Sequence, residues 1–176
     1  MTARKKMGKP DSDVTGIAFP MARSGGLFLV LIGAGLVSAI AFSGEALVNY
    51  TVFFAGVGAA TVSLFVSGRL SAGTPSRIQI TALVFAIGLE IILFAVLGRT
   101  LPRGSAESVR WLWISMLVGI HFLPMALSFG PRMLLLGAAC IVNAVLGLLL
   151  PQLPYEIFGL FDGCLKFGFG LWLLSS

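Results

Sequence analysis

Six long apolar runs, separated by short polar breaks, dominate this sequence. They cover about residues 26–43, 47–67, 78–97, 111–128, 133–150 and 155–174. A helix needs roughly 20 apolar residues to cross a hydrocarbon core about 30 Å thick. Only 11% of the 176 residues are charged, whereas a soluble domain usually carries about a quarter. The pattern predicts an all-α fold, a polytopic membrane protein built as a bundle of six transmembrane helices with short loops.

The first 25 residues differ from the rest of the chain. They are polar and basic, and the stretch from Pro10 to Asp13 disfavours a helix. A signal peptide is the competing interpretation, but the apolar run that follows is long and has no clear small-x-small cleavage site. We therefore expect a disordered cytoplasmic tail at 1–25 and one transmembrane domain at 26–176.

The distribution of Lys and Arg predicts the orientation. If the N-terminus is cytoplasmic, the inner segments hold eight of these residues and the outer segments hold three, namely Arg99, Arg103 and Arg110. Cytoplasmic loops are usually the richer in Lys and Arg. Both termini are thus predicted in the cytoplasm, with anionic lipid headgroups near the basic tail. The basic residues form no patch typical of nucleic-acid binding, so no nucleic-acid partner is expected.

A few charged or strongly polar residues fall near the middle of the predicted spans. They are Glu90, His121, Asn143, Asp162 and Lys166. Ionisable groups at this depth are costly and commonly mark ion or substrate pathways. These five are therefore the candidate substrate- or ion-binding residues. For Asn143 alone, a hydrogen bond that joins two helices is the favoured interpretation.

The last run places an acid and a base one helical turn apart. Asp162 and Lys166 share one narrow helix face with Gly159, Gly163 and Gly170. Glycines beside a charged pair permit close approach of another backbone or leave room for a ligand. The alternative is that Asp162 and Lys166 only neutralise each other and lock helices together.

Charge counting singles out Glu90. If Asp162 pairs with Lys166, Glu90 is left over, and it could hold a proton or a cation, or pair with protonated His121. Such a site is typical of a proton-coupled or cation-handling protein. The favoured function is therefore a small proton- or cation-coupled transporter or channel. The alternative is a structural or regulatory membrane protein.

No motif predicts enzymatic activity, a cofactor or a metal site. Cys140 and Cys164 both lie in apolar runs without CxxC spacing, so we expect packing roles for them. At 176 residues, transport by this chain would call for a homodimer. The small-residue faces of the first two spans are the candidate contacts.

Two short segments resemble known families. The stretch from Val118 to Ala126, with its His-Phe-Leu-Pro core, resembles an uncharacterised family of small bacterial multi-pass membrane proteins. That resemblance implies a bacterial inner-membrane location and no established activity.

The segment from Asp162 to Leu171 resembles the last helix of microbial rhodopsins, in which the lysine binds retinal and the acid is part of its counterion. It implies a retinal-binding photoreceptor with Lys166 as the attachment point. The rest of the chain departs from that family, since six spans are predicted where rhodopsins have seven.

Overall fold

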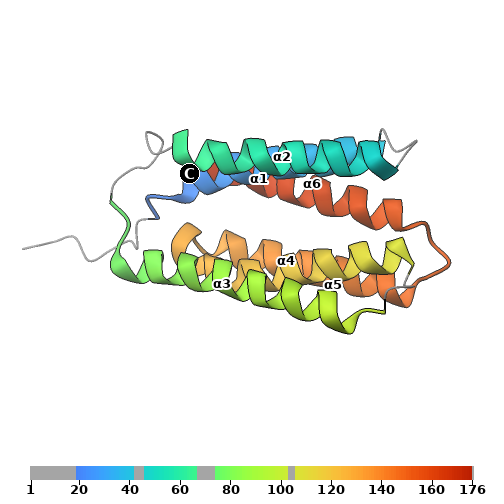
Figure 1. The fold of residues 1–176 in the computed structure, drawn as a ribbon. Coiled ribbons are helices and arrows are strands. Elements are labelled where there is room, and N and C mark those ends of the chain that lie inside the picture. Colours follow the sequence, from blue (N-terminus) through green and yellow to red (C-terminus); the bar gives the residue numbers. More distant parts are fainter. Residues whose placement is uncertain (1–18, 42–45, 67–73, 103–105, 176) are drawn as a thin grey trace, which may run out of the picture.

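The computed structural model describes residues 19–41, 46–66, 74–102 and 106–175, and these residues form six α-helices (Figure 1). The helices are α1 (Ala22–Ala41), α2 (Ala46–Val66), α3 (Arg77–Thr100), α4 (Glu107–Phe129), α5 (Arg132–Leu149) and α6 (Tyr155–Leu174). Each helix coincides with one apolar run, which confirms the all-helical prediction. Most of the predicted tail lies outside the described residues.

The sequence explains several helix ends. At the start of α3, Ser76 and Gln79 form a capping box, in which each side chain bonds to the backbone N–H of the other residue. Helix α4 ends at Gly130, whose φ of 102° suits glycine, and Pro131 follows. The sequence predicted the presence of each helix more accurately than its ends. Helix α1, for example, begins four residues before the expected Gly26.

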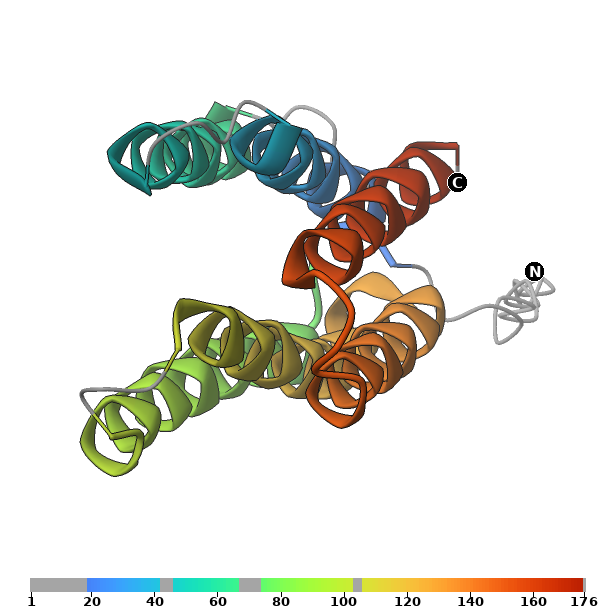
Figure 2. The ribbon, with the colours of Figure 1, turned by 90° about the vertical axis from the view of Figure 1, so that its right-hand side faces the viewer.

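The helices lie in two layers. One layer contains α2, α1 and α6 side by side, and the other contains α3, α4 and α5 (Figure 2). The layers meet where α6 packs on α4 and α5 and where α1 touches α4. Helix α6 therefore joins the layers, and α1 begins at the end of the bundle where α6 ends (Figure 1).

Glycines allow α1 to pack closely on its two neighbours. A Cβ built on Gly33 would lie 2.5 Å from the backbone nitrogen of Phe167 in α6, and one built on Gly35 would lie 3.0 Å from Cα of Gly56 in α2. Contacts this short leave no space for a side chain. The small-residue faces predicted for a homodimer are thus used in part within one chain, and the homodimer stays a prediction.

The buried core lies mainly on α4 and α5, and α1, α3 and α6 also contribute to it. It includes Leu29, Phe122, Met133, Leu136, Cys140 and Leu173. Helix α3 is the most exposed of the helices suited to crossing a membrane, since 11% of its apolar window is buried, and it packs on α4 alone among the described helices.

Five of the helices are long and apolar enough to cross a membrane: α1, α3, α4, α5 and α6. In α2 the residues whose side chains are described form a shorter apolar stretch, Thr51–Ala60. Large apolar side chains also cover the outside of the bundle, including Ile78, Val84 and Ile91. These properties are compatible with an integral membrane protein.

Candidate functional site

One face of α6 leads from the end of the bundle into its interior. Tyr155, Gly159, Asp162 and Lys166 are spaced four, three and four residues apart, which aligns them along one side of the helix. At a rise of 1.5 Å per residue, Asp162 lies about 10 Å along the axis from Tyr155. The polar pair is therefore deep in the bundle, whereas Tyr155 is at its end.

Asp162 and Lys166 form an ion pair within α6. Only 1% of Asp162 and 3% of Lys166 is exposed. Oδ2 of Asp162 accepts a hydrogen bond from Lys166 and another, at 3.4 Å, from the Ser115 hydroxyl of α4. Oδ1 of Asp162 is buried and has no hydrogen-bond partner among the described residues, although the Cys140 thiol is near enough to interact with the same carboxyl group. An unsatisfied buried acceptor costs about 1–3 kcal/mol, and more if it is charged.

The Lys166 ammonium has neighbours from two other helices. Nζ lies 4.0 Å from Sγ of Cys140 in α5 and 6.0 Å from the centre of the Phe122 ring in α4. An aromatic face can stabilise a cation at this range. The sequence identified Cys140 only as a packing residue, because nothing in its spacing reveals that α5 turns it towards Lys166.

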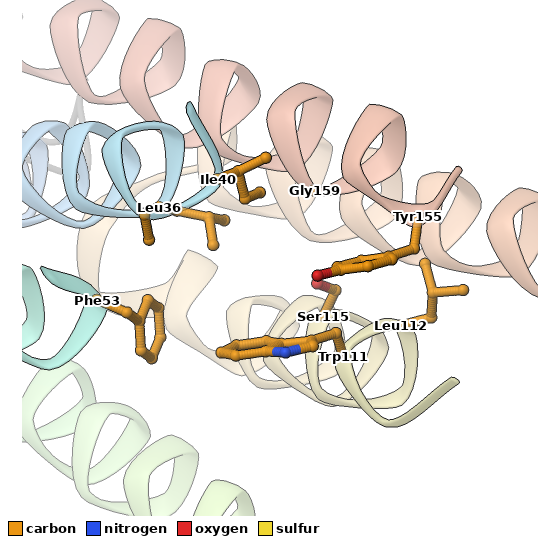
Figure 3. A pocket seen from close by; sticks show the side chains of 9 residues that line it. Leu36, Ile40, Phe53, Trp111, Leu112, Ser115, Tyr155 and Gly159 are labelled. Atoms are coloured by element: carbon orange, nitrogen blue, oxygen red, sulfur yellow. The ribbon is translucent and has the colours of Figure 1, made fainter. Parts of the chain in front are cut away.

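A pocket lies between α1, α2, α4 and α6, near the end of the bundle where α4 and α6 begin (Figure 3). Its walls are Leu36, Ala39, Ile40, Phe53, Trp111, Leu112, Ser115, Tyr155 and Gly159. Ser115 belongs both to this pocket and to the ion pair, since its hydroxyl donates to Asp162. The pocket therefore leads to the residue that contacts the buried carboxylate. The sequence analysis did not identify Ser115, because an isolated serine in an apolar run carries no distinguishing signal.

The second predicted pair joins α3 to α4. Nδ1 of His121 lies 2.9 Å from the carbonyl oxygen of Ala86 and 3.6 Å from Oε2 of Glu90. Because a carbonyl oxygen only accepts, this geometry requires Nδ1 to carry a proton. The Glu90 side chain is 27% exposed and that of His121 is 7% exposed. Glu90 therefore lies beside His121, which is the residue named in one of the three possibilities that charge counting left open.

Asn143 has a different position. Its side-chain amide donates to the carbonyl oxygen of Phe158 at 2.8 Å and so joins α5 to α6. Ser128 joins α4 to α3 in the same way, through a 2.6 Å hydrogen bond to the carbonyl oxygen of Gln79. Both side chains satisfy backbone groups of a neighbouring helix, the arrangement expected of a residue that fixes helix packing.

The five candidate residues thus lie in three places. Among the described residues, no hydrogen bond or ion pair links the Asp162–Lys166 pair to the Glu90–His121 pair or to Asn143. Within residues 19–41, 46–66, 74–102 and 106–175, no three His, Cys, Asp or Glu side chains gather closely enough to hold a metal ion. The sequence analysis expected one midplane site; in the structure the Asp162–Lys166 ion pair lies within α6, and the Glu90–His121 contact joins α3 to α4.

A comparison with family models gives one result, a model described as a family of unknown function (DUF6609), which matches residues 12–176. The match covers all six helices and every candidate residue. No curated protein and no solved structure matches the chain. The description of the family states no activity, ligand or partner.

Proposed function

The chain belongs to DUF6609, a family of unknown function, and from that premise we propose an integral membrane protein that moves protons or small cations through a site at Asp162 and Lys166. The sequence also resembled an uncharacterised family, but the His-Phe-Leu-Pro core motif and the bacterial membrane location of that family stay predictions. The family description carries no activity, so the proposal depends on the geometry of this chain.

The membrane part of the proposal is supported by length and composition. Five helices satisfy both requirements for crossing a bilayer, and their outward side chains are apolar. We propose the bacterial cytoplasmic membrane, with both termini in the cytoplasm as the distribution of Lys and Arg favours. In that orientation the pocket near Tyr155 faces the opposite side of the membrane.

The observation that carries the proposal is the environment of the Asp162 carboxylate. One oxygen is shared by Lys166 and Ser115, while the other is buried with no hydrogen-bond partner in the described part of the chain. A proton or a small cation on that oxygen would remove the cost of leaving it unsatisfied. The Ser115 hydroxyl can both donate and accept, so it can pass a proton between the pocket and Asp162.

The Glu90–His121 contact is a second polar position in the bundle. It lies between α3 and α4, and Glu90 is partly exposed. His121 uses Nδ1 to hold the carbonyl oxygen of Ala86. We propose that the ion pair of α6 forms the pathway.

A structural or regulatory role is the second candidate, and a specific observation favours it. Asn143 and Ser128 each satisfy a backbone carbonyl of a neighbouring helix, and Asp162 and Lys166 neutralise each other. In a purely structural protein the polar residues would do only this. The two candidate functions differ in whether Asp162 exchanges a proton or a small cation with the pocket.

The test is proton flux into liposomes that contain the purified protein and a pH-sensitive dye. A potassium diffusion potential, negative inside, drives the uptake. We expect wild-type protein to acidify the lumen faster than protein-free liposomes do, and Asp162→Asn to slow this at least about tenfold, because an amide carries no exchangeable acidic proton.

Asn143→Ala is the matched control, since it removes a polar contact of similar depth outside the ion pair. Its flux should remain near that of the wild type. Wild-type flux equal to that of protein-free liposomes, for protons and for sodium and potassium ions alike, would favour the structural role. Equal losses of flux in Asp162→Asn and Asn143→Ala would show that Asp162 has no specific role in ion movement.

A further inference from the structure

We propose that the pocket between Trp111 and Tyr155 binds a small ammonium-type cation, such as ammonium or methylammonium. The inference rests on the proposed function, because it names the class of cation that would approach Asp162 from this end of the bundle. It assigns a ligand-binding role to Phe53, Trp111 and Tyr155, which take no part in the Asp162–Lys166 ion pair.

Three aromatic side chains line the pocket, namely those of Phe53, Trp111 and Tyr155. Figure 3 shows the Trp111 and Tyr155 rings on opposite sides of the Ser115 hydroxyl, with Phe53 at a third side. The Phe53 and Trp111 rings meet edge to face, with centroids 5.4 Å apart and an interplanar angle of 84°. This contact fixes the indole against α2. Faces of Trp and Tyr attract ammonium groups, most strongly when water is excluded.

The charge around the pocket also suits a cation. Glu107 accepts a hydrogen bond from Nε1 of Trp111 at 3.4 Å. Glu107 and Glu156 both interact electrostatically with the Tyr155 phenol, so two carboxylates lie at the end where the pocket is found. Arg110 follows Glu107 by three residues but is not among the residues that line the pocket. The residues that do line it include no basic side chain.

Size and hydrogen bonding narrow the ligand further. The cavity volume is ≈ 40 Å³. A cavity of about 10–15 Å³ is enough for one water molecule, so this pocket has room for a group of a few heavy atoms. An ammonium ion needs acceptors for its N–H groups, and the hydroxyl oxygens of Ser115 and Tyr155 face the same space (Figure 3).

The experiment uses tryptophan fluorescence in purified full-length protein. With Trp113→Phe and Trp172→Phe in place, Trp111 is the only reporter. We expect a saturable change on titration with methylammonium chloride and none with sodium chloride at the same ionic strength. Tyr155→Ala should weaken the response about tenfold, because one wall of the site is lost.

A second protein that retains Trp172 alone is the matched control. That indole lies near the other end of α6, where Arg132 sits 4.4 Å from its ring centre, so it should show no saturable response. Equal responses from the two reporters, or the same response to methanol as to methylammonium, would overturn the proposal.

Equilibrium dialysis of radiolabelled methylammonium against unmodified protein decides the question without any substitution. Saturable binding that ammonium chloride displaces supports the site, and binding that does not saturate overturns it. Saturable binding without ion flux would refute the transport proposal alone, whereas flux without binding would refute this inference alone.

Discussion

The Ser115 hydroxyl of α4 lies 3.4 Å from Oδ2 of Asp162 in α6, and the same serine lines the pocket at the end of the bundle. The contact spans 47 positions of the sequence. It connects a buried ion pair to the cavity at the end of the bundle. The first prediction therefore concerns this serine.

Replacing Ser115 by alanine should slow proton flux several-fold while lowering stability by about 1 kcal/mol or less, because one long, shared hydrogen bond is lost. Proton flux in liposomes and thermal unfolding in detergent measure the two effects. Ser128→Ala is the matched control, since it removes another serine of α4 that bonds to α3 instead. Equal flux in the two variants would exclude Ser115 as a relay.

The ion pair itself should respond asymmetrically to substitution. Lys166→Met leaves the buried Asp162 carboxyl without its counter-charge and should cost about 3–5 kcal/mol of unfolding free energy. The double variant Asp162→Val, Lys166→Met should recover most of that loss, since apolar groups of similar size replace a buried pair at little cost. Thermal unfolding of the three proteins measures the difference. A double variant less stable than Lys166→Met would contradict the assignment of a mutually neutralising pair.

The close packing of α1 on α6 gives a steric prediction. A Cβ on Gly170 would lie 2.7 Å from the carbonyl oxygen of Gly26, whereas a Cβ on Gly168 meets nothing within 4 Å. Gly170→Ala should therefore lower stability by about 1–3 kcal/mol, the usual cost of overpacking. Gly168→Ala, two residues away on the same helix, should be neutral or slightly stabilising because alanine favours helix. Thermal unfolding compares the two variants. Similar unfolding midpoints would argue against the close contact between α1 and α6.

Glu90→Gln tests the contact between Glu90 and His121. The substitution keeps the size of the side chain but removes its charge, and the bond from His121 to the Ala86 carbonyl stays available. Stability should change by less than about 1 kcal/mol, because Glu90 is partly exposed. Proton flux in liposomes should stay near that of the wild type, because the ion pair of α6 forms the proposed pathway. A loss of flux as large as that of Asp162→Asn would instead place Glu90 on the pathway.

The amino-acid sequence alone determined the helices and the depth of the polar residues. Apolar length fixes where a helix can cross a bilayer, and the i, i+4 spacing of Asp162 and Lys166 fixes that they can touch, since both depend on local geometry. The partnership of Glu90 and His121 appeared in sequence as one of three possibilities. The glycine-rich face of α6 was also visible in sequence. The sequence did not show which of its glycines allow another helix to approach and which leave room for a ligand.

Only the tertiary structure decided which helices meet around these residues. It placed α6 against both α1 and α4, so that Gly170 approaches the backbone of Gly26 while Gly159 lines the pocket. It brought Ser115 and Cys140 to the ion pair and divided five candidate residues among three places. Spacing along one helix fixes a face, but the order in which faces pair depends on the packing of all the helices at once.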